Sequence, residues 1–285
     1  MLSPVGRRLS VIDWNLRHRV GPAAIEQATY IASFEPDLVL FQEANRDSIA
    51  ALCKGADLDW FRFSLDHRVL MPWDGQRRQL GCAIGGRGIE VGPGRLMTDV
   101  PVPERTLVVD VLVDGAAVVT GAFHAPPGVS WFEKKPAQAV KIAQWLQPLT
   151  GPVIIGMDAN TPQVDHPDFA QTRTHWQTGG ANLSGAPGDD QLVGPAKIHP
   201  LTDALRDWLE AHPAELDAIR ARTNDSGPLA TSYRTGTREG SPGTPHRYDS
   251  IWTHHFRVES IDYHYDEACR LSDHALVHAV LELEP

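Results

Sequence analysis

The chain has few cysteines and no long hydrophobic run, and each shortage excludes a class of protein. Its three cysteines, Cys53, Cys82 and Cys269, are odd in number and far apart, which argues against a disulfide framework or a zinc cluster. Free thiols suit a reducing compartment, so we expect a cytoplasmic protein. No apolar run approaches the ~20 residues that span a bilayer, and residues 1–8 lack the apolar stretch of a secretory signal. We therefore expect no membrane insertion.

Basic residues are fewer than acidic ones, so the net charge is −10 at pH 7. This charge does not favour a protein that coats nucleic acid with a broad basic face. It leaves a nuclease open, since bound divalent cations neutralise an acidic site and a small basic patch then suffices. The residues that could form such a patch are Arg7, Arg8, Arg17, His18, Arg19, Arg77 and Arg78. Solvated surface charge is the alternative for each of them.

No glycine-rich phosphate loop and no internal repeat is present, and strand patterns occur in both halves of the chain. Apolar and β-branched runs predict strands over 9–14, 38–42, 79–84, 106–113, 116–123, 153–157, 248–253, 258–265 and 275–283. Asp114-Gly115, between two of these runs, predicts a hairpin with a tight primed turn. This pattern favours an α+β fold with two packed sheets and outer helices, in a single domain over residues 1–285.

Helical spacing of apolar residues predicts helices over 22–34, through 49–52, over 132–149, and over 201–222 with an interruption at Pro213. The segments between them differ in composition. Residues 55–80 have no sustained period before the strand at 79–84, so we expect an irregular stretch. Residues 160–200 and 223–246 are rich in glycine, proline and threonine, and we expect the first to be a long surface loop. Long ordered loops in a compact domain often carry function.

Polar side chains stand at the ends of the predicted strands. They are Asn15, Glu43, His124, Asp158, Asn160, Asp249, Asp273 and His274. Carboxylates, amides and imidazoles suit a hard divalent cation and a phosphate better than acyl or hydride chemistry. Buried strands that each present a polar residue at the tip therefore predict the active site of a hydrolase on a rigid scaffold.

In chain order, these residues and their neighbours resemble the motifs of the endonuclease/exonuclease/phosphatase superfamily. The motifs are Trp14-Asn15, Gln42-Glu43, Phe123-His124, Asp158-Ala159-Asn160, Arg247-Tyr248-Asp249 and Ser272-Asp273-His274. The superfamily includes pancreatic-type deoxyribonucleases, apurinic-site endonucleases, inositol-polyphosphate 5-phosphatases and neutral sphingomyelinases. The resemblance spans residues 9–283 and implies a four-layer α/β-sandwich. In that fold two packed, mostly antiparallel sheets are flanked by helices, with the site at one edge.

The resemblance also implies a metal and a role for each residue. Asn15 and Glu43 would help to hold Mg²⁺ or Mn²⁺, with Asp273 supporting the same metal region, since these ions prefer oxygen ligands. Asp158 would orient and deprotonate the attacking water, and Asn160 would hydrogen-bond a phosphoryl oxygen. Their one-residue spacing would place both side chains on the same side of an extended chain.

The two histidines would face the phosphate. His274 would contact it as a cation, because a hydrogen bond to Asp249 raises the pKa of the imidazole. His124 would be a second phosphate contact. The deoxyribonuclease branch pairs this first histidine with a glutamate on a preceding strand, whereas residues 78–81 of this chain contain none. That departure leaves a general-acid role for His124 open.

Each residue taken alone also has a plainer interpretation. Asn15 could form a turn that closes a strand, and Glu43 could be a carboxylate in the first turn of a helix. For Asp158 and Asn160 the plainer interpretation is loop capping, and for Asp249 it is an ion pair with Arg247. Asp273 and His274 could form a strand-entry turn. His124 could be a hydrogen-bonded histidine beside a Pro-Pro turn. Because six such coincidences in family order are required, we favour the active site.

The leading hypothesis is a phosphodiesterase that cleaves nucleic acid, DNA or RNA. The alternative is a phosphomonoesterase or phosphodiesterase on a small phosphorylated molecule, such as a sugar, inositol or lipid head group. Arg17 after Asn15, and the presence of His124, argue against the apurinic-site branch. Tyr233 could stack on a base or sugar, or pack in the core. A binding protein with a dead site is less favoured, because no core motif is lost.

Overall fold

The computed structural model describes residues 7–68, 79–127, 133–174, 177–178, 181–182 and 188–284. Arg77 and Arg78, proposed as basic surface residues, lie outside these ranges. Phe132, the first residue of the helix predicted over 132–149, lies outside them as well.

The first sheet has the strand order β15-β16-β1-β2-β4-β3. Its strands are β1 (Arg8–Asn15), β2 (Leu38–Asn45), β3 (Trp60–Phe63), β4 (Leu80–Gly86), β15 (Phe256–His264) and β16 (Leu276–Leu283). Neighbouring strands are antiparallel except β1 and β2, which run parallel. In that parallel pair Asn15 lies opposite Gln42, the residue before Glu43. Two of the predicted metal ligands therefore stand at the same edge of this sheet.

The second sheet has the order β11-β14-β8-β7-β6-β5. Its strands are β5 (Glu90–Arg95), β6 (Thr106–Val113), β7 (Ala116–His124), β8 (Val153–Asp158), β11 (Thr202–Asp203) and β14 (Asp249–His254). Only β7 and β8 run parallel. Their register places His124 opposite Asp158, and the antiparallel register of β14 places Asp249 opposite Asp158 on the other side. Three predicted site residues thus form a row across three neighbouring strands.

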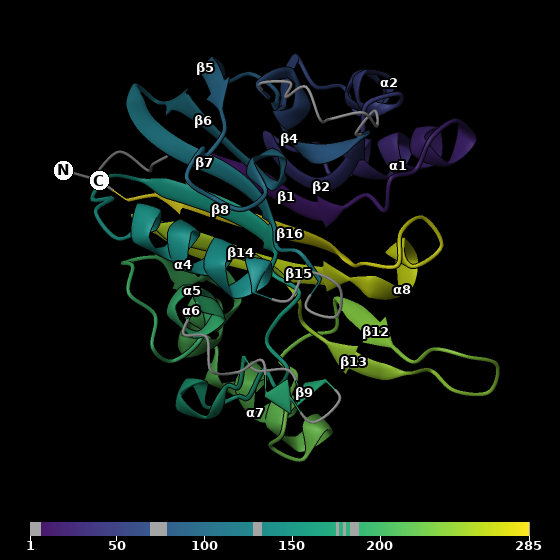
Figure 1. Cartoon of the computed structure of the whole chain (residues 1–285), viewed down its shortest axis with the longest axis vertical. Helices are drawn as coiled ribbons and strands as arrows, with labels where there is room; N and C mark the ends of the chain where they lie inside the picture. Colours follow the sequence, from purple (N-terminus) through teal and green to yellow (C-terminus); the bar gives the residue numbers. More distant parts are fainter. Residues whose placement is uncertain are drawn as a thin grey trace.

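Helices cover the outer faces of the two sheets (Figure 1). The buried aliphatic side chains between the sheets include Val11 and Leu40 from the first and Val109 and Ile251 from the second. On the outside of the first sheet lie α1 (Pro22–Ala32) and α2 (Ile49–Gly55). On the outside of the second lie α4 (Lys134–Leu146) and α5 (Gly188–Val193). The predicted four-layer sandwich of two mostly antiparallel sheets is confirmed.

Two local predictions are confirmed in detail. Asp114 and Gly115 have φ angles of 50° and 82°, as a primed turn between β6 and β7 requires. The helical stretch 201–222 divides at Pro213, because α6 (Ala204–Ala211) ends before that proline and α7 (Pro213–Thr223) begins with it. Proline lacks the N–H that a helix interior needs but suits a first turn.

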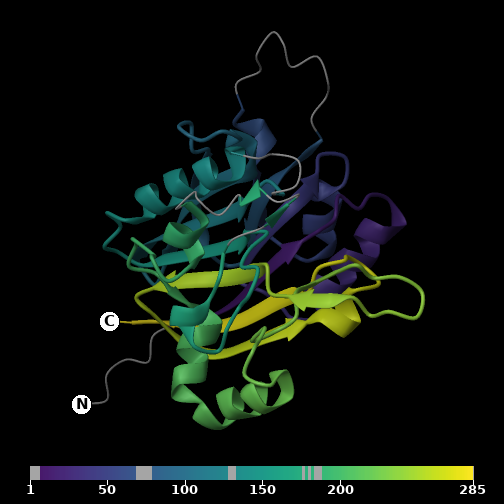
Figure 2. The same ribbon diagram turned by 60° about the horizontal axis from the view of Figure 1, so that its bottom comes forward.

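Other parts of the sequence predictions are wrong. Residues 55–80 contain the edge strand β3, whose pairing with β4 outweighs its weak local pattern. Residues 160–200 are not a surface loop throughout, since Thr161, Asp165 and Thr174 are buried and α5 forms within the stretch. Residues 223–246, for which only the composition was noted, hold a hairpin of β12 (Tyr233–Thr235) and β13 (Thr244–His246), which projects in yellow-green in Figure 2.

The remaining elements are short. They are β9 (Gln177–Thr178), β10 (Ala181–Asn182), α8 (Tyr265–Ala268) and the 3₁₀ turns η1 (Ser64–Asp66), η2 (Pro103–Arg105) and η3 (Phe169–Gln171). Within the described part of the chain, no helix combines the length and the apolar character that crossing a bilayer requires.

Candidate active site

Asp158, the last residue of β8, lies at the centre of the predicted site and is buried. Its Oδ2 accepts a hydrogen bond from Asn15 Nδ2 at 2.9 Å, and its Oδ1 accepts one from the backbone N of Asn160 at 2.9 Å. The same Oδ2 lies 3.6 Å from His124 Nε2 and 3.9 Å from His274 Nε2. Four predicted site residues therefore meet at one carboxylate.

His274 and Asp249 form a buried hydrogen-bonded pair, with His274 Nδ1 2.8 Å from Asp249 Oδ2. Burial alone would lower the pKa of His274, but the charges of Asp249 and Asp158 outweigh it and raise the pKa to about 10. His274 is therefore a cation at neutral pH. The alternative of an ion pair between Asp249 and Arg247 is wrong, because the Arg247 guanidinium binds Asp165 and Asp203 instead.

His124 is the opposite case. Burial is the main cause that lowers its pKa to about 3, and the guanidinium of Arg105 acts in the same direction. Arg105 Nη1 lies 3.3 Å from His124 Nε2, so that nitrogen accepts a hydrogen bond and carries no proton. The 3.6 Å approach of His124 to Asp158 is therefore not an ion pair. A neutral imidazole with this tautomer does not suit a general acid acting through Nε2.

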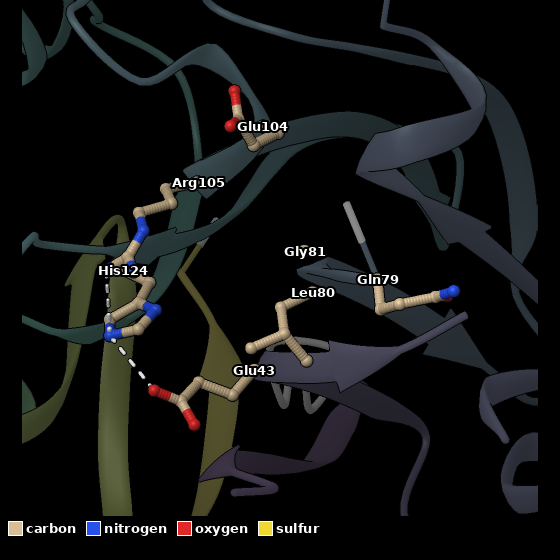
Figure 3. Close-up of a pocket in the computed structure, with 7 residues that line it drawn as sticks. All are labelled: Glu43, Gln79, Leu80, Gly81, Glu104, Arg105 and His124. Atoms are coloured by element: carbon tan, nitrogen blue, oxygen red, sulfur yellow. Dashed lines mark hydrogen bonds and ion pairs between the residues drawn. The ribbon is translucent and has the colours of Figure 1, made fainter. Parts of the chain in front are cut away.

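Arg105 was not found by the sequence analysis. It ends η2 immediately before β6, where Thr106 pairs with Phe123, the residue before His124. The predicted hairpin could have revealed it, because that register brings the start of β6 beside the end of β7. Arg105, His124 and Glu43 line one cavity of about 200 Å³, and Figure 3 shows their side chains. The lining residues are Glu43, Gln79, Leu80, Gly81, Glu104, Arg105 and His124.

Glu43 belongs to β2, so the interpretation as a helix carboxylate is wrong. The pairing of β2 with β4 shifts register between Phe41 and Ala44, and Glu43 has a φ of 47°. Such bulges redirect a side chain, and left-handed backbone at a non-glycine residue is typical of functional sites. Glu43 Oε1 lies 3.8 Å from His124 Nε2, and Oε2 lies 3.3 Å from His18 Nδ1.

Asn160 does not continue an extended chain, so the spacing argument for Asp158 and Asn160 is wrong. Its φ is 48°, which places it in a left-handed turn directly after β8. Besides the bond from its backbone N to Asp158, its Nδ2 donates to the carbonyl O of Ala125 at 3.0 Å. The turn, and not strand alternation, brings Asn160 to Asp158.

Asp273 lies at the rim and is the most exposed of the three predicted metal ligands, with 37% of its side chain accessible. It pairs with Arg17 Nε at 3.3 Å, and the backbone N of Arg17 donates to Asn15 Oδ1 at 2.9 Å. The other described arginines considered for a basic patch also have partners. Arg7 pairs with Asp37, Arg8 pairs with Glu259, and Arg19 donates to Leu271 O.

A buried carboxyl group, Asp13, lies next to the site and was also missed, since it sits inside an apolar strand. Its Oδ1 accepts a hydrogen bond from Gln42 Nε2 at 2.7 Å. Burial, followed by the charge of Asp249, raises the pKa of Asp13 well above its ordinary value. The glycine at 156 makes room for it, because a Cβ there would lie 2.3 Å from Asp13 Oδ1. Its neutral form is therefore favoured, and the side chain is packed between the sheets.

Tyr233 covers one side of His274. Its ring lies 4.7 Å from the His274 ring and 5.6 Å from the Tyr248 ring, measured between centroids. Tyr248 in turn stacks on His246 at 4.9 Å. Tyr233 is half-buried at the first position of β12, where it packs against the site.

Ligand atoms of a metal-binding kind gather here. Asp158, Asp249 and His274 each offer an atom within 4.8 Å of the others. Because His274 is held as a cation by Asp249, these three fit a hydrogen-bonded acid–base set better than a metal shell. Glu43 and Asn15 supply the hard oxygens that a divalent cation prefers. Asn15 Oδ1 accepts one hydrogen bond, from Arg17, and an amide oxygen has a second lone pair.

The fold matches that of solved structures. An endonuclease/exonuclease/phosphatase protein from Bacteroides vulgatus superimposes with a TM-score of 0.64 and 15% identity, covering 98% of this chain and 100% of that one. D. rerio TDP2 complexed with a single-strand DNA product gives 0.62 and 13%, covering 96% and 99%. The human Nocturnin catalytic domain with bound sulfate gives 0.60 and 15%, covering 97% and 94%.

These likenesses show the fold. The chain has the endonuclease/exonuclease/phosphatase fold, and the resemblance inferred from the motifs is confirmed at the level of the fold. No family model and no curated protein matches the sequence.

Proposed function

We propose that this chain is a divalent-metal-dependent phosphodiesterase that cleaves nucleic acid by in-line attack of water. The observation that carries the proposal is the environment of Asp158. This buried carboxylate lies between a neutral imidazole, His124, and a cationic one, His274, with Asn15 and Asn160 bonded to it. A base, two amides and a fixed cation at one point suit attack on an anionic phosphoester.

Each side chain then has a task. Asp158 orients the attacking water and takes its proton. His274, held by Asp249, donates a hydrogen bond to a phosphoryl oxygen and balances the negative charge of the transition state. Asn160 donates to a second phosphoryl oxygen. Arg105, beside the neutral His124, adds a second cation on the opposite side of Asp158.

Asn15, Glu43 and Asp273 would hold Mg²⁺ or Mn²⁺. When bound, such an ion neutralises the phosphate and stabilises the charge that develops on the leaving oxygen. The donor set supports this assignment, because carboxylate and amide oxygens are the ligands that these ions prefer. The open sides of Glu43 and Asp273 fit an ion that keeps water and substrate oxygens as further ligands.

Nucleic acid is the favoured substrate. Among the proteins of this fold, D. rerio TDP2 has been solved with a single-strand DNA product. Tyr233, beside His274, supplies an aromatic ring of the kind on which an unpaired base stacks. A small phosphoester is the second candidate, and the cavity of about 200 Å³ between Arg105, His124 and Glu43 is the observation that favours it.

The first test is to incubate the purified protein with supercoiled plasmid in Mg²⁺ or Mn²⁺. We expect nicking that EDTA abolishes and that restored metal recovers. Asp158→Ala should remove the nicking, whereas Asp217→Ala, the same kind of loss on the exposed surface of α7, should not.

Bis(p-nitrophenyl) phosphate and p-nitrophenyl phosphate separate the remaining outcomes. Turnover of the monoester alone would replace the nuclease with a phosphomonoesterase. Turnover that persists in EDTA, or that survives Asp158→Ala, would overturn the mechanism.

A further inference from the structure

A buried lysine that the proposed mechanism does not use lies behind the active-site turn. Lys135 is in the first turn of α4, and only 3% of its side chain is accessible. Burial of an ammonium group is unfavourable unless the charge is paired and hydrogen-bonded. Lys135 has two such partners. Its Nζ donates to the carbonyl O of Asn160 at 2.6 Å and lies 3.6 Å from Asp189 Oδ2.

The first partner is the turn that presents a phosphoryl contact. Left-handed backbone is strained for a residue with a side chain, although asparagine tolerates it better than most. Asn160 is held in that conformation from three directions, by Asp158 at its backbone N, by Ala125 at its Nδ2 and by Lys135 at its carbonyl O. The first two partners belong to the strand ends of β7 and β8, and only Lys135 comes from a helix.

The second partner fixes Lys135 itself. Asp189 is in the first turn of α5, which packs closely on the first turn of α4. A Cβ at Gly188 would lie 2.0 Å from the carbonyl O of Pro136, so only glycine permits this approach. Burial lowers the pKa of Lys135, and the charges of Asp189 and Asp158 oppose that shift. The ammonium is thus held at a set distance behind the turn.

We propose that Lys135 is a positioning residue whose ammonium holds the Asn160 turn in the geometry that presents the Asn160 amide to a phosphoryl oxygen. This inference rests on the proposed function. Lys135 acts through Asn160 and does not touch the substrate. Its loss should therefore reduce the rate of the chemical step more than substrate binding, because a misplaced donor weakens the transition state most.

The test is a double-mutant cycle with Lys135→Met and Asn160→Ala. Lys135→Met should lower kcat about tenfold with a smaller change in KM. The double variant should be no slower than Asn160→Ala alone, because Lys135 has no amide left to position. Lys134→Met is the matched control, since it makes the same change at the exposed neighbouring residue and should leave kcat unchanged.

A structural role alone predicts a different pattern. Lys135→Met would then lower the melting temperature but keep kcat in the folded fraction. In the double variant, the reductions in kcat of the two single variants would multiply. A wild-type kcat in Lys135→Met would overturn the proposal, and so would kcat reductions that multiply in the double variant. If Lys135→Met does not fold, Lys135→Gln keeps a hydrogen-bond donor without the charge, and Asp189→Asn loosens Lys135 from the other side. Both should reduce kcat less than tenfold.

Hydrogen exchange keeps this inference distinct from the proposed function. The backbone N–H of Asn160 is bonded to Asp158, so its exchange should be slow in the wild type and faster in Lys135→Met, without any substrate. If the wild type hydrolyses no phosphoester, the proposed function fails while the exchange rate still decides the role of Lys135. Unchanged exchange at Asn160 would overturn the positioning role even in an active enzyme.

Discussion

Two clusters of buried charge in this molecule differ in balance. In the first, Asp165 and Asp203 face Arg206 and Arg247, two carboxylates against two guanidiniums. We call this set the ion network. In the second, around Asp158, the carboxylates Glu43, Asp158 and Asp249 lie close to the cations Arg105 and His274. A third cation, Lys135 behind the Asn160 turn, is paired with Asp189.

The difference shows in the acidities. In the ion network, burial would raise the pKa of Asp165, but Arg247 and Arg206 lower it to about 2. Around Asp158 the pKa values of the two histidines shift in opposite directions. The pKa of His124 is lowered to about 3, and that of His274 is raised to about 10. Balanced charges stabilise a fold when every member keeps its partner. Charges left in excess, with acidities driven in opposite directions, indicate a site that binds and reacts.

Removing one guanidinium from the ion network should have the largest effect on stability. Arg247→Met leaves Asp203 and Asp165 short of a guanidinium in a buried place, and we expect a loss of about 3 kcal/mol or more in unfolding free energy. Urea unfolding measures it. The control is Arg257→Met, which removes an arginine with 61% of its side chain accessible and should have little effect. Equal losses in the two variants would show that the ion network contributes no more to stability than an exposed ion pair.

Active-site substitutions should act on rate instead. We expect Asn160→Ala and His274→Ala each to reduce kcat by at least about a hundredfold, the scale of one lost transition-state donor. Each should reduce stability less than Arg247→Met does. Steady-state kinetics on the substrate that the wild type hydrolyses, with the melting temperature of each variant, gives both quantities. Wild-type rates in both variants would mean that the phosphate lies elsewhere.

These two clusters were not equally visible in the sequence. The strand-end residues of the site were predictable, because apolar strands in register bring their tips together, as His124, Asp158 and Asp249 show. Asp165 was hidden in a segment expected to be a surface loop, since nothing local indicates that Arg247, 82 residues away, will bury it. Lys135 was missed for the same reason, because its partners come from other elements. Arg105 could have been found from the register of the predicted hairpin.

Acid should weaken the ion network at a pH below the ordinary pKa of an aspartate. Asp165 binds a proton more weakly in the folded chain than at its ordinary pKa of 3.8, so the unfolded chain takes up the proton first as pH falls. The stabilisation is complete above pH 3.8 and is lost as pH falls toward about 2, a change of about 2 kcal/mol. Unfolding free energies measured across this range should fall for the wild type and fall less for Asp165→Asn. Parallel profiles would contradict this assignment.

The smallest effect that we expect is on the KM of a variant at Arg105 in the active site. Arg105 lines the same cavity as Glu43, and its Nη1 donates to His124 Nε2 and to the carbonyl O of Ala125, both at 3.3 Å. A charged hydrogen bond to a phosphoester contributes about 1.5 kcal/mol, so Arg105→Met should raise KM about tenfold and change kcat less. Arg95→Met, which removes a surface arginine paired with Asp110, is the control and should leave KM unchanged. If KM is unchanged in both variants, Arg105 serves only to hold His124 neutral, and His274 alone supplies the positive charge that meets the phosphate.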